Sequence, residues 1–219
     1  MSSKSNTSLI PLDVLFGNPE RVSPKISPDG TKMAYIAPFN KVLNVWMRSI
    51  NSQDDKPVTR DMDRGIRTYL WGYDNKRILY LQDRGGNENF HLYSTDLESL
   101  KSTDLTPFKN IQVRILEHVN QFPNEILLSI NKDDPRIHDV YKLTFDTGIL
   151  ELVCKNPGNV VGWEADYNLQ IRAATCARPD GGFDLLVRDN DKSKWRLKVT
   201  WDPEDALTSQ PLSFTKDGM

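Results

Sequence analysis

The sequence predicts an all-β fold assembled from repeated sheets of short antiparallel strands, and three observations carry this prediction. Turn-forming segments recur along the 219 residues at intervals of 44 to 49 positions. A short run of apolar, strand-like residues follows each of the first four turns. The one helix candidate is short and covers residues 11–16. A period of about 40–50 residues with several short strands per unit is typical of a β-propeller, whose blades are four-stranded antiparallel sheets.

Two independent landmarks share this period, which favours a true repeat over coincidence. The first is the turn itself, because Gly, Pro, Asn and Asp supply the backbone angles of tight turns. The second is an aromatic or aliphatic residue in the second strand of each repeat. The turns start at Asp29, Asp74, Pro123, Tyr167 and Lys216, and the second-strand residues are Trp46, Tyr93, Tyr141 and Leu186, spaced 47, 48 and 45 positions apart.

Each repeat is expected to contribute one blade with two well-marked strands. A fourth strand is visible in the first repeat at residues 56–59 and in the third at 149–153. The first marked strands are residues 32–36, 77–81, 125–129 and 169–173, and the second are 44–48, 90–94, 138–142 and 183–187. The expected blades are residues 22–60, 66–107, 111–156 and 159–201, followed by the start of a fifth at 207–219.

The two ends of the chain are expected to differ from the blades. Residues 1–21 form an N-terminal segment whose short helix is expected to pack on the first blade, and residues 22–219 form a partial propeller. Because propellers close to remove exposed strand edges, an ending inside a blade indicates a fragment, a truncated gene product or a piece that pairs with something else. The alternative is that the last turn is a tail and that four blades close alone.

Composition excludes several function classes. Lys and Arg total 28 and Asp and Glu total 30, for a net charge of −2. This balance argues against a nucleic-acid partner and against a polybasic membrane surface. No apolar run approaches the roughly 18 residues of a membrane span, and residues 1–8 lack the apolar core of a secretory signal. Cys154 and Cys176 are expected to be reduced core thiols, so the sequence predicts a cytoplasmic protein without metal or cofactor.

Two segments connect the repeat with a known family. Residues 26–35 read ISPDGTKMAY and resemble the SPDG-x-x-x-AY blade start of many propellers. Residues 82–93 read QDRGGNENFHLY and resemble the D-x-G-G-D-E-N-x-x-L-Y segment in the propeller domain of the prolyl oligopeptidase family of serine peptidases, with Asn87 where Asp is usual. The likeness is strongest to the acylaminoacyl-peptidase-like bacterial branch, which residues 15–19 and 105–108 also resemble. It covers the chain from Ile10 onward and concerns only the propeller half.

The catalytic half of that family is not visible in this sequence. Family members carry an α/β-hydrolase domain whose Ser nucleophile lies in a G-x-S-x-G elbow. Here the only two glycines four positions apart, Gly158 and Gly162, enclose Val160. No catalytic residue is therefore assigned to the chain, which by itself is not expected to hydrolyse peptides. The histidines His91, His118 and His138 are interpreted as ordinary strand or loop residues.

The resemblance implies a role in substrate gating. In the family, the propeller covers the active site of the hydrolase domain and restricts entry to peptides and other small substrates. An α/β-hydrolase catalytic domain and peptide substrates are therefore the implied partners. The rival hypothesis is a stand-alone propeller that serves as a protein-interaction scaffold. A third, a glycosidase, would need paired carboxylates on facing strands.

One loop is the candidate for substrate contact. In it, Glu88 can pair with the terminal ammonium of a peptide and Arg84 with a carboxylate, with Asn87 and Asn89 beside them. A plain hairpin turn at residues 85–87 explains the same residues. A second polar loop, residues 64–67, is expected to be a solvated linker that can contact a hydrolase domain.

The last expectation concerns the open face of the fourth blade. Blades pack face to face, so an apolar face without a neighbouring blade favours association. Residues 211–214 are expected to cover only a small part of it, and we therefore expect self-association or marginal stability. The exposed face is expected around Leu185, Val187, Leu197 and Val199.

Overall fold

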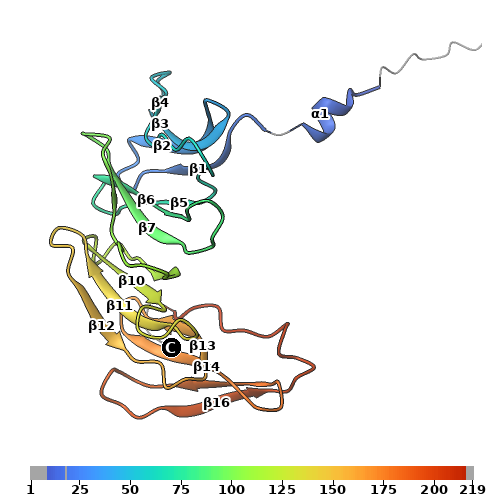
Figure 1. Cartoon of the computed structure of the whole chain (residues 1–219), viewed down its shortest axis with the longest axis vertical. Helices are drawn as coiled ribbons and strands as arrows, with labels where there is room; N and C mark the ends of the chain where they lie inside the picture. The colour runs from blue at the N-terminus through green and yellow to red at the C-terminus, as the bar shows by residue number, and fades with distance from the viewer. Residues whose placement is uncertain (1–8, 18, 216–219) are drawn as a thin grey trace, which may run out of the picture.

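The computed structural model describes residues 9–17 and 19–215 and consists almost entirely of strands (Figure 1). Its strands form four four-stranded antiparallel sheets, and in each sheet the strands follow one another in chain order. This up-and-down order arises because antiparallel neighbours can be joined by short hairpins. The first sheet contains β1 (Val22–Ile26), β2 (Lys32–Phe39), β3 (Val42–Ser49) and β4 (Lys56–Pro57).

The other three sheets repeat this plan within the expected intervals of the chain. The second contains β5 (Tyr69–Trp71), β6 (Arg77–Gln82), β7 (His91–Asp96) and β8 (Ser102–Asp104). The third contains β9 (Val113–Glu117), β10 (Glu125–Ile130), β11 (Asp139–Thr144) and β12 (Leu150–Cys154). The fourth contains β13 (Val160–Ala165), β14 (Ile171–Ala177), β15 (Phe183–Val187) and β16 (Arg196–Trp201). The prediction of an all-β chain of four-stranded antiparallel blades is confirmed.

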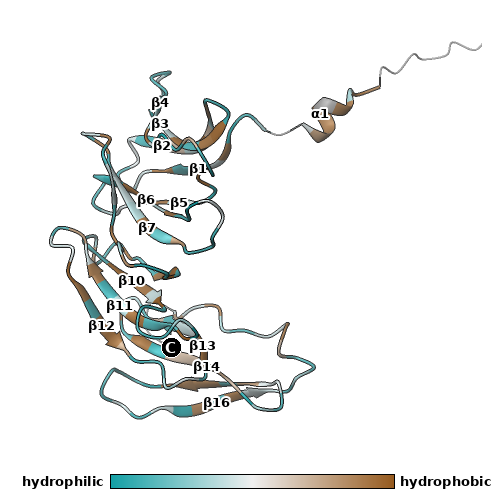
Figure 2. Ribbon diagram, in the orientation of Figure 1, coloured by the Kyte–Doolittle hydropathy of each residue, from teal (hydrophilic) through white to brown (hydrophobic). Residues whose placement is uncertain are grey.

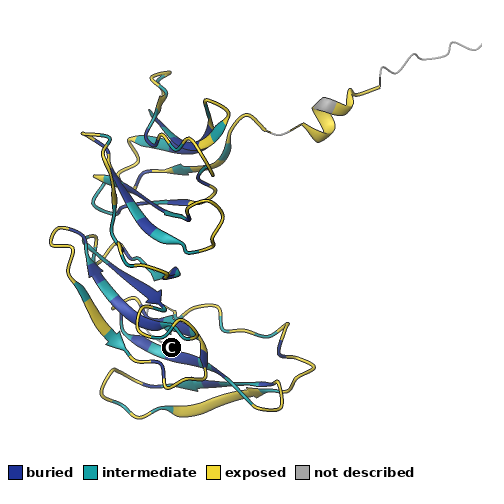
Figure 3. Ribbon diagram, in the orientation of Figure 1, coloured by how far each residue is buried: buried dark blue, intermediate teal, exposed yellow. Residues whose placement is uncertain are grey.

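Apolar cores between successive sheets hold the blades together. Adjacent strand residues point to opposite faces, so a strand covered on both faces carries a continuous apolar run. In β6, Ile78 belongs to the core shared with the first sheet, whereas Leu79 belongs to the core shared with the third. In β10, Leu128 faces the second sheet and Leu127 the fourth. Figure 3 shows the central strands buried and β16 exposed, and Figure 2 shows apolar residues along the strands.

Polar contacts between turns add to these cores. Asn75, in the turn before β6, accepts a hydrogen bond from the backbone N–H of Asp29 at 3.0 Å through its side-chain oxygen. The Arg77 guanidinium donates to Asp74 at 2.7 Å and to Asp146 of the third sheet at 3.2 Å. The first three sheets are thus tied to one another at their turns as well as along their faces.

The N-terminal helix forms where the sequence predicts it but does not pack as expected. α1 (Leu12–Phe16) stands away from the sheets in Figure 1. Its Phe16 side chain is 80% exposed, and Leu9 before it is 94% exposed. Packing on the first blade is therefore wrong. The four described side chains of this helix are all exposed, and strand β1, which follows the helix in the chain, is itself largely exposed and offers it no apolar surface. Residues 1–8 and 18 lie outside the described part.

The C-terminal segment folds back toward the fourth sheet. Residues 202–215 contain no strand, and the expected turn at 216–218 lies outside the described residues. The Phe214 ring lies 5.0 Å from the Arg172 guanidinium, and Leu185 is buried. Val199, opposite Leu185, remains 37% exposed, so the open face is covered only in part. Leu197 does not belong to that face as expected, because it lies opposite Leu186, which packs on the core shared with the third sheet. In the described chain, α1 is too short to cross a bilayer.

Candidate functional site

The candidate site lies at one end of the sheets, where two kinds of loop meet. In an up-and-down sheet, the connection from the second to the third strand and the exit from the fourth strand lie at the same end. The β6–β7 and β10–β11 loops and the connections between successive sheets therefore gather there. Substrate-contacting residues are commonly placed on such loops over a rigid scaffold.

A cavity of about 830 Å³ opens at this end, and we call it the loop cavity. Its walls come from the β6–β7 loop, β9, the β10–β11 loop and β13. This volume is within the range of about 300–1,000 Å³ that small-molecule sites occupy. The polar and charged residues of its lining include Asn87, Glu88, Asn89, Gln112, Arg114, His138 and Glu164.

The loop predicted from the sequence contributes three residues to this cavity. Asn87, Glu88 and Asn89 line it, whereas Arg84 does not and instead lies 3.5 Å from the Tyr93 hydroxyl through its Nη2. The loop is also a well-formed turn. The N–H of Asn89 donates to the side-chain oxygen of Asn87 at 3.0 Å, and Gly86 has a φ of 79° that favours glycine. The turn interpretation and placement at the cavity are therefore compatible.

The buried side chain of Asp83 anchors the β6–β7 loop. Its side chain is only 5% exposed, and its Oδ1 lies 3.6 Å from Nε of Arg64. Its Oδ2 accepts a hydrogen bond from the backbone N–H of Glu88 at 3.1 Å. A Cβ at Gly86 would lie 3.2 Å from the Arg64 guanidinium, so glycine leaves room for that ion pair. This anchoring sets where the Glu88 backbone stands at the rim.

Two further carboxyl groups lie on the first strands of the third and fourth sheets. β9 and β13 are adjacent, and they carry Glu117 and Glu164. Burial raises the pKa of Glu164 to about 7, and the Glu117 charge adds to the effect. Burial also raises the pKa of Glu117, against the opposing hydrogen bond from the His118 N–H at 3.0 Å. Glu164 thus holds a proton more readily than an exposed carboxyl.

Cationic and imidazole groups form another part of the lining. Arg114 follows Val113 in β9 and donates to the side-chain oxygen of Gln112 at 3.1 Å. Burial and the Arg114 charge lower the pKa of His138, which keeps its ring neutral. Its Nε2 atom is buried and has no hydrogen-bond partner among the described residues. The loop cavity therefore offers carboxyl, guanidinium, amide and imidazole groups to a polar ligand.

Sequence reasoning missed Arg114, Glu117, His138 and Glu164 as site residues. A signal existed for these residues, because each is 47 positions, one repeat period, from a residue of the same type. Glu117 and Glu164 lie at equivalent points of first strands, and the other two pairs are Arg67 with Arg114 and His91 with His138. Within residues 9–17 and 19–215, no group of three or more His, Cys, Asp or Glu side chains is placed to hold a metal ion.

Comparison with known proteins identifies proteins that are similar to this chain. No family model matches the chain. It is 40% identical over 215 residues to dipeptidyl aminopeptidase BIII of Pseudoxanthomonas mexicana. The aligned region is 98% of this chain and 31% of that protein. It is 27% identical over 225 residues to dipeptidyl peptidase family member 6 of Caenorhabditis elegans, covering 95% and 30%. The chain thus spans about a third of the length of these relatives.

Solved structures share the fold at low sequence identity. TolB from Acinetobacter baumannii matches with a TM-score of 0.56 and 16% identity, over 90% of this chain and 47% of that one. A puromycin hydrolase S511A mutant complexed with PGG matches with a TM-score of 0.56 and 15% identity, over 90% and 32%. At this identity the likeness concerns the fold. The chain is therefore a partial β-propeller that is similar in sequence to a dipeptidyl aminopeptidase and to a dipeptidyl peptidase family member, over about a third of the length of each.

Proposed function

We propose that the chain is the non-catalytic, substrate-gating propeller portion of a serine peptidase of the prolyl oligopeptidase family. In this proposal, an α/β-hydrolase domain of the full-length protein cleaves the peptide. The loop cavity receives the amino-terminal part of that peptide. The observation that carries the proposal is a cavity of about 830 Å³ lined by groups of both charge signs, in a chain 40% identical to part of a dipeptidyl aminopeptidase.

The lining supplies what a peptide terminus requires. Glu88 at the rim is a carboxylate for the terminal ammonium, and Asn87 and Asn89 carry amide groups for neighbouring peptide bonds. Arg114 can donate to peptide carbonyl oxygens. A propeller that covers the reaction centre also excludes folded proteins and bulk water from it. A cytoplasmic location is part of this proposal, in keeping with two cysteines that are not disulfide-bonded.

Peptide binding to the purified chain tests the proposal. We expect a tripeptide with a free amino terminus to bind, and its N-acetylated form to bind about 10–100-fold more weakly, because a charged hydrogen bond contributes about 1.5–3 kcal/mol. Glu88→Gln should remove this difference. Glu98→Gln, a change at an exposed residue outside the cavity, is the matched control.

Two results would contradict the proposal. Equal affinity for the free and acetylated peptides would remove Glu88 as the ammonium partner. Hydrolysis of the peptide by the chain, blocked by a serine-directed inhibitor and detected by mass spectrometry, would contradict a non-catalytic role. Binding of folded proteins in place of peptides would favour the interaction scaffold.

A further inference from the structure

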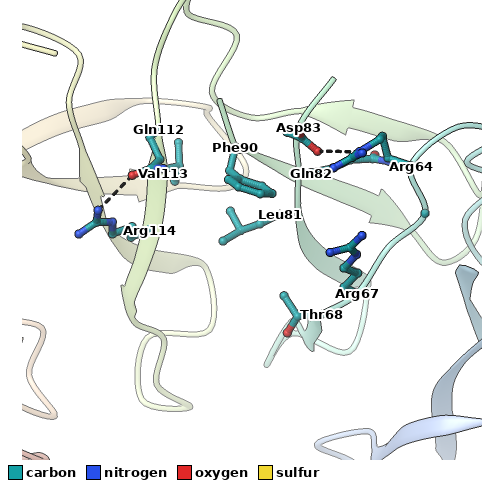
Figure 4. Close-up of a pocket in the computed structure, with 11 residues that line it drawn as sticks. Arg64, Arg67, Thr68, Leu81, Gln82, Asp83, Phe90, Gln112, Val113 and Arg114 are labelled. Carbon is teal, nitrogen blue, oxygen red and sulfur yellow. Dashed lines mark hydrogen bonds and ion pairs between the residues drawn. The ribbon is translucent and has the colours of Figure 1, made fainter. Parts of the chain in front are cut away.

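A second cavity lies beside the loop cavity and has a different chemistry. Its volume is about 410 Å³, and we call it the arginine cavity (Figure 4). It is formed by the connection between β4 and β5, the end of β6, the β6–β7 loop and the start of β9. Its lining residues include Arg64, Arg67, Leu81, Asp83, Phe90, Val113 and Arg114.

The middle of the arginine cavity is apolar. Figure 4 shows Leu81 and Phe90 next to one another, with Val113 nearby. The Val113 N–H donates to the Phe90 carbonyl oxygen at 2.8 Å, which fixes the β6–β7 loop against β9. Apolar surface left open in a cavity favours a ligand that covers it. The cavity is therefore suited to an apolar side chain rather than to a small, fully hydrated ion.

Positive charge surrounds this apolar centre in excess. Three arginines and one aspartate are among the residues that line the cavity, and Asp83 is already engaged by Arg64 at 3.6 Å. In the part of the chain that the structure describes, Arg67 has no ion pair, and Arg114 donates to the neutral amide of Gln112. Figure 4 shows Arg64 and Arg67 on one side of Phe90. Arg114 is on the other side, with its guanidinium directed toward Gln112.

We propose that the arginine cavity binds a carboxylate carried on an apolar residue. Planar guanidinium groups match carboxylates in geometry and charge, and Leu81, Phe90 and Val113 would cover the apolar side chain. An ammonium group is disfavoured there by the cationic excess. Two sources supply this chemistry, namely the carboxyl terminus of a short peptide and an Asp or Glu side chain within an apolar segment.

The two cavities are neighbours, since Gln112 and Arg114 line both. Under the proposed function, on which this step alone rests, a short peptide spans them with its amino end in the loop cavity and its carboxylate in the arginine cavity. The chain would then select short peptides by binding both of their termini.

Binding of N-acetyl-leucine to the 219-residue chain, followed by NMR titration, tests the arginine cavity directly. This probe lacks an ammonium group, so its binding is independent of the proposed role of Glu88. We expect N-acetyl-leucinamide to bind at least tenfold more weakly than the acid. Arg67→Gln and Arg114→Gln should each weaken acid binding about tenfold or more, since each removes a charged hydrogen-bond donor. The Phe90 and Val113 signals should shift with the acid.

Matched controls keep this test decisive. Arg196→Gln removes an exposed guanidinium of the fourth sheet, outside the arginine cavity, and should leave acid binding unchanged.

A blocked peptide with one internal Glu between leucines distinguishes the two sources of the carboxylate. Binding as tight as that of the acid assigns a side-chain carboxylate, and weaker binding assigns the carboxyl terminus. Equal binding of acid and amide, equal binding of inorganic phosphate, or unchanged binding in both Arg variants that retain the wild-type melting temperature would overturn the proposal.

Discussion

Replacing Glu164 by Gln should make the stability of the chain less dependent on pH. Glu164 lies on β13 beside Glu117 of β9, and burial raises the pKa of Glu164 from 4.5 to about 7. The folded state therefore binds a proton that the unfolded state releases near pH 4.5. The ionisation of Glu164 adds no cost to folding below that pH. The cost grows as the pH rises toward 7 and levels off above it. The neutral amide of Gln removes this ionisation while keeping the shape of the side chain.

The size of the effect follows from the pKa difference. At about 1.4 kcal/mol per pKa unit, the full difference corresponds to at most about 3.5 kcal/mol. Because Glu164 is only half-buried and solvent screens its charge, we expect about 1–2 kcal/mol. For a chain of this length, that corresponds to a shift of about 2–8 °C in melting temperature.

Thermal unfolding followed by circular dichroism at pH 5 and pH 8 measures this effect. The Glu164→Gln variant should gain stability relative to the wild type at pH 8 and gain less at pH 5. His118 and His138, whose pKa values burial lowers, favour folding at higher pH and act in the opposite sense, but they are common to both proteins. Glu98→Gln, at an exposed turn residue, should show no such pH dependence. An equal Glu164→Gln difference at both pH values would refute the reasoning.

Three other outcomes follow from the packing of the sheets. Arg77→Met should lower the free energy of unfolding, measured by urea denaturation, by about 1–3 kcal/mol, because Asp74 and Asp146 lose a shared guanidinium. An unchanged free energy would mean that this contact does not stabilise the fold. Asn156→Ala should lower the free energy of unfolding by about 2–4 kcal/mol, because the buried Asn156 amide hydrogen-bonds to backbone groups at the junction of the third and fourth sheets. An unchanged midpoint of urea denaturation would contradict this. The open face at Val199 should cause self-association at micromolar concentration, and a sharp monomer peak in light scattering, unchanged with concentration, would argue against it.

Local patterns in the sequence determined the strands, the repeat and the class of fold. Turn residues such as Asp29 and Asp74 and the apolar runs after them depend only on neighbouring positions, and those neighbours are visible in a sequence. The helix at Leu12–Phe16 was predictable for the same reason, but its packing was not. Whether a helix packs depends on a complementary apolar surface elsewhere, and β1 does not provide one. The same limit applies to Arg84, whose loop was predictable but whose direction was not.

Only the tertiary structure decided which residues share a cavity. Glu117 and Glu164 are one repeat apart in the chain, and they become neighbours because β9 and β13 lie side by side. Arg67 belongs to the connection between β4 and β5 and Arg114 to β9, and they meet at one cavity only after the second sheet is placed between them. Such contacts depend on how whole sheets stack against one another, through apolar cores built from residues tens of positions apart. A binding site assembled from several blades is therefore a property of that stacking, which no single segment of the sequence encodes.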